Sequence, residues 1–237
     1  YNFALLVVRD AAAIRDHLET LARFADHWPC IAFSNHDVTR TVTRFGPGSA
    51  KVMLALLLAM RGTVLLYQGE ELGLPEVDLR RDQLRDPVGD LYYPLFKGRD
   101  GCRTPMPWDG GAPHLGFSAA TPWLPPGPAH AALGAAQQER DPDSALHFTR
   151  ALLRARASHE ALRTGILQLL DAPLPLIAFV RGADLLCVFN LGRETVAWAP
   201  PADAVAAEFG MTGEVTQTVQ GLVLGPLSAW FGILKGR

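Results

Sequence analysis

Residues 35–40 carry four side chains that could act on a bound molecule. They are an amide, an imidazole, a carboxylate and a guanidinium, at Asn35, His36, Asp37 and Arg40. The apolar run before them, Trp28–Phe33, is typical of a short buried strand. In α/β barrels the loops that leave the C-terminal ends of parallel strands converge on one mouth, which holds the active site. A plain turn is the other interpretation, because Asn, Asp and Ser side chains often bond their own backbone where a strand ends.

The composition is that of a soluble globular protein with a sizeable core. Of the 237 residues, 49% are hydrophobic and 19% are charged, which suits one large domain or two ordinary ones. The formal net charge of -2 and a pI near 6.4 give no electrostatic reason to expect nucleic acid or a membrane surface as partner. Cys30, Cys102 and Cys187 are too widely spaced for a metal knuckle, so we expect free thiols in a reducing, cytoplasmic compartment. The longest apolar run, Val52–Met60, is too short to span a bilayer, and no signal peptide is expected at Tyr1.

Strands and helices alternate in the N-terminal part of the sequence. The apolar runs Asn2–Val8, Trp28–Phe33 and Gly62–Tyr67 predict three strands. Asp10 is suited to cap a helix between the first two. The apolar residues of that helix recur at helical spacing, at Ile14, Leu18, Leu21, Ala25 and Trp28. Val52–Met60 predicts a second, buried helix, and this alternation favours parallel strands with right-handed crossovers.

Regular patterns stop between Pro75 and Pro142. Eleven of the chain's eighteen prolines lie in this stretch, which has no sustained periodicity. Its aromatic residues argue against disorder, because a solvated linker rarely contains so many rings. They are Tyr92, Tyr93, Phe96, Trp108, Phe117 and Trp123. We therefore predict a long, ordered loop over a site, at about residues 75–142.

A helix and a set of short strands follow. Asp141 predicts the N-cap of a helix that runs to about His159, with Arg150, Arg154 and Arg156 facing solvent. Short β-prone runs separated by Gly, Pro or Asp then predict an antiparallel β-sandwich. They are Ile166–Leu170, Leu176–Arg181, Leu185–Asn190, Glu194–Trp198, Glu214–Val219, Leu222–Leu224 and Ser228–Ile233. The predicted fold is thus α/β plus all-β, with an α/β part at residues 1–162 and an all-β part at residues 163–237.

Three motifs follow one another along the chain, at Phe33–Asp37, Tyr67–Gly73 and Gly98–Asp109. Together they resemble the motifs of the α-glucosidase branch of glycoside hydrolase family 13, the α-amylase family. The resemblance implies that the three predicted strands are strands six to eight of a (β/α)8 TIM barrel, followed by the family's C-terminal β-sandwich. It also implies a retaining α-glucosidase, whose substrate is terminal non-reducing α-linked glucose in short oligosaccharides or glucosides.

The resemblance further assigns roles to three side chains. Asp37 matches the third carboxylate of the family's triad, which holds the 2- and 3-hydroxyls of the sugar and stabilises an oxocarbenium-like transition state. We expect a cationic or hydrogen-bonding neighbour beside such a fixed anion. His36 resembles the family's sugar-binding histidine. Arg103 resembles the arginine that pairs with an Asp near the first strand and binds the 4-hydroxyl of the glucose, which suits its planar fork.

A retaining mechanism needs two carboxyl groups about 5–5.5 Å apart across the cleaved bond. By the resemblance, a nucleophilic Asp and an acid/base Glu follow the fourth and fifth barrel strands and would precede Tyr1. We therefore expect the chain alone to be inactive and its open barrel edge to favour self-association. No cofactor and no metal are predicted, since no His, Cys or carboxylate cluster has metal-ligand spacing.

The roles of several charged residues stay open. Glu70 and Glu71 are adjacent, and neighbours on a strand point to opposite sides, so they cannot flank one bond as a pair. Glu70 could line the floor of the site, although a structural hydrogen-bonding role is favoured. Arg40 and Arg44 either pair with Asp37 or face solvent, and the sequence does not decide between these.

Other functions share the same motifs. Tyr92 and Tyr93 could stack on a sugar or pack beneath the long loop. Glucosyltransferases and sugar isomerases of the family differ from hydrolases in whether water or a sugar intercepts the intermediate. Non-catalytic relatives act as partners of other proteins. The presence of both Asp37 and Arg103 argues against that last class, because a scaffold does not need a glucose pocket.

Overall fold

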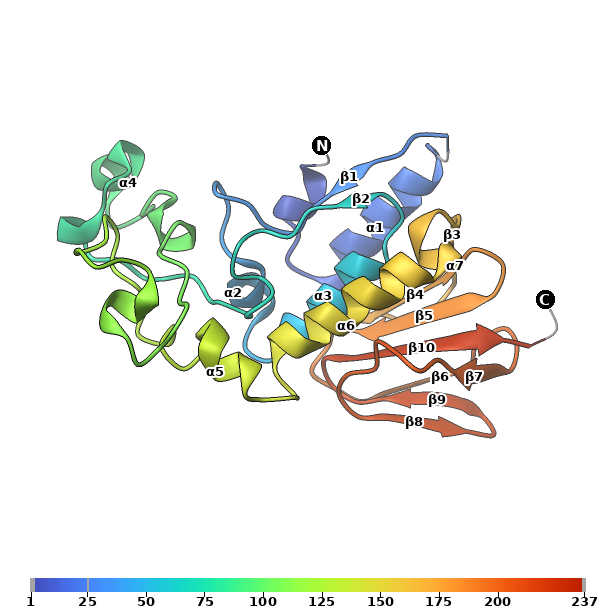
Figure 1. The fold of residues 1–237 in the computed structure, drawn as a ribbon. Helices are drawn as coiled ribbons and strands as arrows, with labels where there is room; N and C mark the ends of the chain where they lie inside the picture. Colours follow the sequence, from blue (N-terminus) through green and yellow to red (C-terminus); the bar gives the residue numbers. More distant parts are fainter. Residues whose placement is uncertain (1–2, 25, 236–237) are drawn as a thin grey trace. The chain divides into compact units, whose positions relative to one another are not determined.

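Figure 1 shows the fold in a computed structural model, which describes residues 3–24 and 26–235. Its helices and 3-10 helices are η1 (Ala4–Leu6), α1 (Ala11–Ala22), α2 (Thr41–Phe45), α3 (Ala50–Ala59), η2 (Arg81–Gln83), α4 (Pro87–Tyr92), η3 (Asp100–Cys102), η4 (Pro113–Gly116), α5 (Ala135–Glu139), α6 (Ala145–Ser158) and α7 (Glu160–Arg163). Its strands are β1 (Cys30–Ile31), β2 (Thr63–Val64), β3 (Leu167–Leu169), β4 (Leu176–Arg181), β5 (Leu185–Asn190), β6 (Val196–Trp198), β7 (Ala204–Ala206), β8 (Val215–Thr218), β9 (Gly221–Leu224) and β10 (Ser228–Leu234).

The chain divides into two compact units. The first unit comprises Tyr1–Ala32, Lys51–Leu65 and Phe148–Arg237, and the second comprises Phe33–Ala50 and Leu66–His147. Each unit therefore draws on segments that are distant in the sequence. The predicted division after residue 162 is a different one and stays a prediction.

β1 and β2 form a two-stranded parallel sheet in the first unit, which confirms the predicted parallel pairing. Cys30 lies opposite Thr63 in this sheet. Both strands are shorter than the apolar runs that predicted them. Gly62 precedes β2 with a φ of 135°, and a Cβ there would lie 2.5 Å from the carbonyl oxygen of Pro29. Only glycine tolerates both that backbone angle and that close approach.

The first predicted helix is present as α1. The Oδ1 atom of Asp10 accepts a hydrogen bond from the amide of Ala13 at 2.8 Å, so Asp10 caps the helix as predicted. Ile14 and Leu18 are buried on one face of it. Ala25, which the spacing also placed in this helix, lies outside the described residues.

The strand predicted over Asn2–Val8 is wrong for the part of that run that the structure describes. η1 occupies its centre, and the amide of Leu6 donates to the carbonyl of Phe3 at 3.1 Å. A strand needs a neighbour for its backbone groups, whereas a 3-10 turn bonds its own. The apolar composition is explained by burial, because Leu5 and Leu6 are in the core. Asn2 lies outside the described residues.

Two arginines bind the C-terminal end of α3. Nη1 of Arg156 donates to the carbonyls of Leu58 at 2.6 Å and Met60 at 3.0 Å, and Nη1 of Arg181 donates to the carbonyl of Ala59. The last carbonyls of a helix have no partner within it, so these contacts satisfy them. The prediction that Arg156 faces solvent is therefore wrong.

Antiparallel strands form two further sheets in the first unit. One sheet has the order β3-β4-β5-β10-β7 and the other the order β6-β9-β8. β4 and β5 have the predicted bounds, whereas β7 was not predicted. Val188 and Trp230 of the larger sheet belong to the same apolar cluster as Leu222 of the smaller one. Buried Asn190 joins strands as well, because its Nδ2 donates to the carbonyl of Leu224 at 3.1 Å.

The second unit is built from loops and short helices, as the Pro-rich composition predicts. An apolar cluster of Val77, Leu79, Leu84 and Leu124 holds it together, with Tyr93 packed against it. A separate cluster lies elsewhere in the same unit, formed by Leu72, Leu74 and Leu146. Residues 75–142 thus contain a packed apolar cluster of their own.

α6 begins later than predicted. Oδ1 of Asp141 accepts from the amide of Asp143 at 3.0 Å and so forms a turn before the helix. The helix is capped instead by Ser144, whose Oγ accepts from the amide of His147 at 3.3 Å. Arg154, by contrast, is exposed as predicted.

Two further findings concern predicted properties of the whole chain. Across residues 3–24 and 26–235, no helix is both long enough and apolar enough to cross a membrane. Cys30, Cys102 and Cys187 are free thiols, as their spacing predicts.

Candidate active site

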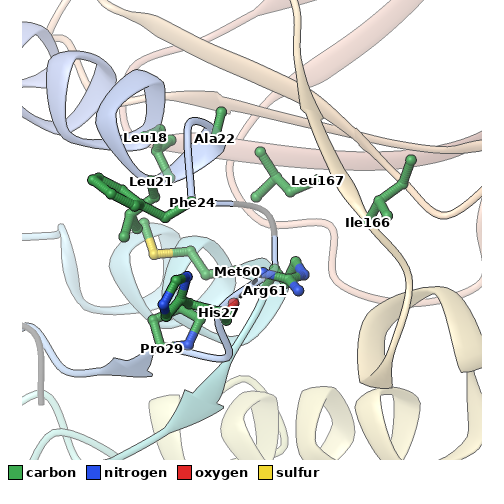
Figure 2. A pocket seen from close by; sticks show the side chains of 10 residues that line it. All are labelled: Leu18, Leu21, Ala22, Phe24, His27, Pro29, Met60, Arg61, Ile166 and Leu167. Atoms are coloured by element: carbon green, nitrogen blue, oxygen red, sulfur yellow. Dashed lines mark hydrogen bonds between the residues drawn. The ribbon is translucent and has the colours of Figure 1, made fainter.

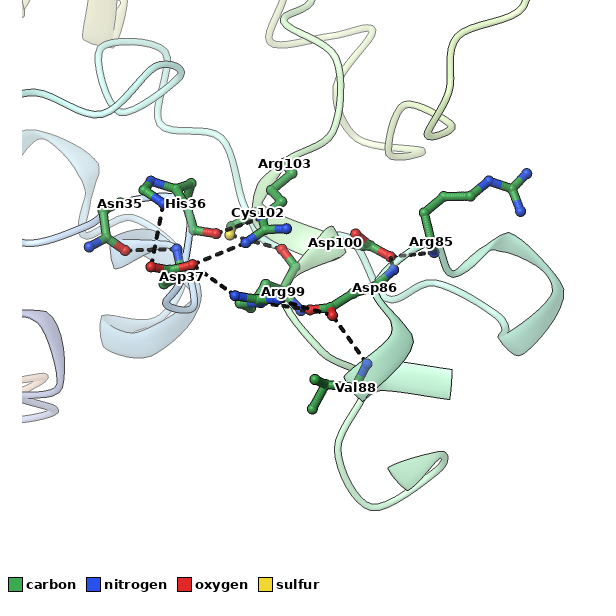
Figure 3. Close-up of polar contacts among 10 residues, drawn as sticks. All are labelled: Asn35, His36, Asp37, Arg85, Asp86, Val88, Arg99, Asp100, Cys102 and Arg103. Atoms are coloured by element: carbon green, nitrogen blue, oxygen red, sulfur yellow. Dashed lines mark hydrogen bonds and ion pairs between the residues drawn. The ribbon is translucent and has the colours of Figure 1, made fainter. Parts of the chain in front are cut away.

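The predicted site residues come together in the second unit, where Asn35, His36 and Asp37 lie in the loop that follows β1 in the sequence. The amide of Asp37 donates to Oδ1 of Asn35 at 2.8 Å, so this segment forms the turn that its composition also allowed. The turn aims the Asp37 carboxylate at a group of cationic side chains (Figure 3). The predicted turn is therefore confirmed, and the candidate site residues His36 and Asp37 lie within it.

Two guanidinium groups share one oxygen of Asp37. Nη2 of Arg103 lies 3.0 Å from Oδ1 and Nη1 of Arg99 lies 3.4 Å from the same atom. Nε2 of His36 lies 3.4 Å from the other oxygen, Oδ2. Nε of Arg103 also donates to the carbonyl of His36 at 2.7 Å, which ties the two loops together. The structure thus brings together His36, Asp37 and Arg103, with the cationic neighbours expected beside Asp37.

The carboxylate of Asp37 is accessible from solvent. Its side chain is 46% exposed, and that of His36 is 67% exposed. A molecule that carries hydroxyl groups could therefore reach both residues. The arginines hold the carboxylate in place, because charge-assisted hydrogen bonds are stronger than neutral ones.

Arg99 is a site residue that the sequence did not single out. Its Nε and Nη2 donate to the two carboxylate oxygens of Asp86, at 2.7 Å and 3.1 Å. The hydrogen bonds from Arg99 hold the pKa of Asp86 well below its usual range, and the same contact raises the pKa of Arg99. Arg99 lies within the Gly98–Asp109 motif, which is the one signal that could have pointed to it. Asp86 precedes Pro87, a pattern that predicts only a helix cap.

The open question about Arg40 is answered by its contacts. Its Nη1 donates to the carbonyl of Gln68 at 2.8 Å and its Nη2 to the carbonyl of Cys102 at 2.9 Å. The guanidinium lies 5.3 Å from the centre of the Tyr67 ring, and burial lowers its pKa. Arg40 is 1% exposed, so it joins the loops beneath the site and does not face solvent. Arg44 likewise donates to backbone, from its Nε to the carbonyl of Thr39 at 3.1 Å.

Glu70 has the hydrogen-bonding contacts of a structural residue. Its Oε1 accepts from the hydroxyl of Thr41 at 2.7 Å, and its Oε2 accepts from the amide of Tyr67 at 2.8 Å. Burial raises the pKa of Glu70. The carboxylate of Glu71 accepts from the amide of Gly69 at 2.8 Å, so each glutamate has its own backbone partner.

Tyr92 and Tyr93 differ in their surroundings. Tyr93 packs against the apolar cluster of the second unit, and Nζ of Lys97 lies 5.6 Å from the centre of its ring. Tyr92 is 56% exposed. Packing therefore accounts for Tyr93, while Tyr92 keeps a face that a ligand could contact.

A hollow of about 520 Å³ lies beside Arg103 in the second unit. Three of its aromatic side chains are well exposed, at Trp108, Phe117 and Trp123. Gln68 and Glu71 add polar groups to its lining. Ligand pockets combine apolar walls with a few polar groups in this way.

A second hollow, of about 80 Å³, lies in the first unit and has a different character (Figure 2). Its lining is mainly apolar, and the ten lining residues include no carboxylate. They are Leu18, Leu21, Ala22, Phe24, His27, Pro29, Met60, Arg61, Ile166 and Leu167. Glycoside hydrolysis needs carboxyl groups, so this hollow is not a candidate for it. In the described parts of the chain, no group of three or more His, Cys, Asp or Glu residues could hold a metal ion.

Comparison with known proteins agrees with the motifs. The family model of the α-amylase catalytic domain matches residues 2–165. A probable alpha-glucosidase of Rhizobium meliloti (strain 1021) is 45% identical over 176 residues, which are 70% of this chain and 32% of that protein. The chain belongs to the α-amylase family, glycoside hydrolase family 13, and is similar to its α-glucosidases.

Solved structures of related enzymes have the same fold. The alpha-glucosyl transfer enzyme XgtA matches 99% of this chain at 38% identity with a TM-score of 0.93. The trehalulose synthase MutB from Pseudomonas mesoacidophila MX-45 matches 99% at 25% identity with a TM-score of 0.87. The chain covers 46% of the first structure and 50% of the second, so it spans about half the length of these enzymes.

Proposed function

We propose that this chain is part of a retaining α-glucosidase that releases terminal non-reducing α-linked glucose from short oligosaccharides or glucosides. The observation that carries the proposal is the Asp37 carboxylate, solvent-accessible, held by Arg103 and flanked by His36. Similarity to a probable alpha-glucosidase supports the same activity.

In this proposal Asp37 is an electrostatic catalyst. A sugar ring that develops positive charge in the transition state is stabilised by a fixed anion more strongly than the neutral ground state is. Because Arg99 and Arg103 already hold the carboxylate, it need not reorganise when the charge appears. His36 and Arg103 provide hydrogen-bond donors for hydroxyl groups of the same glucose unit.

The nucleophile and the acid/base belong, in this proposal, to parts of the parent protein other than residues 1–237. Two carboxylates in the same hydrogen-bond network as Asp37 are unsuited to these roles. Asp86 is buried and bound to Arg99, and Asp100 is buried with one oxygen bound to the amides of Arg85 and Asp86. Neither could approach a glycosidic bond. We therefore expect the chain alone to be inactive.

We also infer that residues 1–162 contribute the C-terminal part of a (β/α)8 barrel, with β1 and β2 as two of its parallel strands. Residues 163–237 would then be the C-terminal β-sandwich. Two antiparallel sheets that share one apolar cluster support the second assignment. Parallel pairing of β1 and β2 supports the first. Self-association through an open barrel edge stays a proposal.

A glucosyltransferase or a sugar isomerase is the second candidate. The favouring observation is the similarity to an alpha-glucosyl transfer enzyme and to a trehalulose synthase. The hollow beside Arg103, with its exposed aromatic side chains, could hold an acceptor sugar in either class. Product analysis with and without added acceptor sugar separates transfer from hydrolysis.

The test is release of p-nitrophenol from p-nitrophenyl α-glucoside. The assay compares the 237-residue chain, the longest natural protein that contains it, and Asp37→Asn in both. We expect the longer protein to be active and Asp37→Asn to lower its kcat by ~100–1000-fold, because removing preorganised electrostatic stabilisation has costs of that size. Unchanged melting temperature in Asp37→Asn would show that the loss is not unfolding.

Three results would contradict the proposal. Turnover by the short chain, abolished by Asp37→Asn, would mean that the catalytic carboxyl groups lie within residues 1–237. A longer protein in which Asp37→Asn keeps full activity would remove Asp37 from the mechanism. An inert longer protein that still binds glucose would favour the non-catalytic relatives.

A further inference from the structure

We propose that Asp86 is a positioning residue, which orients Arg99 so that Arg99 can hold the carboxylate of Asp37. This inference deepens the proposed function and rests on it. Asp86 is nine-tenths buried or more, and its contact with Asp37 runs entirely through Arg99 (Figure 3). It is thus a residue that acts on the site without touching a substrate.

The geometry of the guanidinium carries the argument. A guanidinium is planar, so fixing one of its edges fixes the direction of the others. The Nε and Nη2 edge of Arg99 is bound to both oxygens of Asp86. The remaining nitrogen, Nη1, then lies 3.4 Å from Oδ1 of Asp37. Since the side chain of Arg99 is 39% exposed, packing alone does not hold it in this orientation.

Asp86 is itself held firmly. Its backbone amide donates to Oδ2 of buried Asp100 at 2.7 Å. Its side chain also accepts from the amide of Val88 at 3.2 Å and from the amide of Arg99 at 3.0 Å. The carboxylate therefore has a fixed place and direction before Arg99 binds to it. A long, flexible side chain gains a defined orientation from such an anchor.

Charge balance gives Asp86 a second effect on the site. Asp37 and Asp86 carry two negative charges, and Arg99 and Arg103 carry two positive ones. Replacing Asp86 with a neutral residue would leave the positive charge of Arg99 unbalanced beside a sugar ring that becomes positive in the transition state, and this effect also requires Arg99. That change disfavours the transition state more than the ground state, so kcat should fall more than KM rises.

A purely structural role is the alternative, because Asp86 caps the short helix α4. The two roles differ in one measurable way. If Asp86 acts through Arg99, its loss matters only while Arg99 is present. If it only stabilises α4, its loss adds to that of Arg99. A double-mutant cycle measures this difference directly.

The experiment uses the longest natural protein and measures kcat and KM with p-nitrophenyl α-glucoside for four variants: Asp86→Asn, Arg99→Gln, the double variant and a control. We expect Asp86→Asn to lower kcat by ~10–100-fold with a smaller change in KM, since a misplaced catalytic group has costs of this order. The double variant should have the kcat of Arg99→Gln alone. Asp90→Asn is the matched control, because Asp90 pairs with exposed Arg81 at 2.8 Å and should keep wild-type kcat.

Three results would overturn the inference: a kcat of Asp86→Asn within twofold of wild type, losses that multiply in the double variant, or a loss confined to KM. If Asp86→Asn does not fold, Arg99→Lys takes its place. A lysine has one ammonium group and cannot bind Asp86 along an edge while reaching Asp37. Its kcat should also fall ~10–100-fold, and wild-type kcat would overturn the inference.

Failure of the proposed function gives a different result, namely a wild-type protein without α-glucosidase activity. The positioning role is then tested by crystal structures of the wild type and Asp86→Asn. We expect Nη1 of Arg99 to stay beside Asp37 in the wild type and to leave it in the variant. An Arg99 that keeps its place in Asp86→Asn would overturn the positioning role whatever the activity is.

Discussion

Two places in the molecule gather a pair of arginines, and the two pairs bind different partners. At the C-terminal end of α3, Arg156 and Arg181 donate to backbone carbonyls. At Asp37, Arg99 and Arg103 donate to a side-chain carboxylate. The carbonyls at the end of a helix carry a partial negative charge of roughly half a unit, whereas the carboxylate of Asp37 carries a full negative charge.

The two pairs of arginines also differ in how exposed their surroundings are to solvent. Arg181 is 0% exposed, and burial lowers its pKa to about 10. Asp37 is 46% exposed, so its carboxylate can meet a ligand. The comparison teaches that the partner and its accessibility define the role of an arginine. Arginines on buried carbonyls join parts of the fold, while arginines on an accessible carboxylate hold a charge that a ligand can reach.

Arg181→Met tests the buried pair of arginines, and we expect it to lower the free energy of unfolding more than any other substitution considered below. Nη2 of Arg181 donates to the carbonyls of Leu162 at 3.1 Å and Gly165 at 3.0 Å, in addition to its contact with α3. The substitution leaves these buried carbonyls without a donor, and each such loss costs about 1–3 kcal/mol. We expect the free energy of unfolding to fall by ~3 kcal/mol in urea titrations, after allowing for the packing that Met restores.

Arg154→Met is the matched control for that experiment. Arg154 lies on α6 and is exposed, so its replacement should change the free energy of unfolding by less than about 0.5 kcal/mol. Equal effects of the two substitutions would break the comparison, because Arg181 would then contribute no more than a surface arginine.

Arg103→Lys, made in the longest natural protein, tests the pair of arginines at Asp37. We expect it to lower activity and to leave stability nearly unchanged, which is a smaller effect than that of Arg181→Met. Lysine keeps the charge but cannot bind Asp37 and the His36 carbonyl together along one planar edge. We expect kcat/KM for p-nitrophenyl α-glucoside to fall by about 10-fold or more and the melting temperature to stay near that of the wild type. Arg80→Lys is the control, because exposed Arg80 pairs with Asp82 at 3.0 Å. Wild-type kcat/KM in Arg103→Lys would show that the arginine fork is not needed.

The smallest effect is expected for Glu70→Gln and depends on pH. Because burial raises the pKa of Glu70, the folded state holds its proton to higher pH than the unfolded state does. The wild type therefore loses stability as the pH rises from the unfolded pKa, about 4.3, through the raised folded pKa. Gln cannot ionise and avoids this loss.

The measurement is the free energy of unfolding of both proteins at acidic and at neutral pH. The difference between Glu70→Gln and wild type should favour the variant more at neutral pH. The hydrogen bonds from Thr41 and Tyr67 oppose the effect of burial, so the change should be modest. A difference that does not change with pH would mean that Glu70 ionises as easily in the folded chain as in the unfolded one.

Local patterns predicted much of the secondary structure. The bounds of β4 and β5 and the cap at Asp10 followed from apolar runs and from one short polar side chain. These features depend on near neighbours in the sequence, so periodicity and capping rules describe them. The short strand β7 was missed because Ala204–Ala206 is only three residues long and contains a single β-branched residue, Val205, which is too little to signal a strand.

The wrong or missing predictions have a common cause. In each case, contacts with residues distant in the sequence, or the lack of such contacts, determine the structure. η1 lies in an apolar run that looks like a strand, because periodicity does not say whether a neighbouring strand is present. Arg156 was predicted to face solvent from its place on α6, but carbonyls about a hundred residues earlier bind it. Asp86 and Arg99 are thirteen positions apart, and nothing in the sequence around either residue predicts that they bind each other.

The sequence by itself determined the family and the candidate residues His36, Asp37 and Arg103, because these lie in short motifs whose spacing is local. Only the tertiary structure decided that Arg99 and Arg103 share one oxygen of Asp37, that Arg40 lies beneath the site and that Asp86 anchors Arg99. The physical reason is that an arginine can bind any carboxylate or carbonyl within reach. Which one it binds depends on the packing of loops that the chain order does not specify.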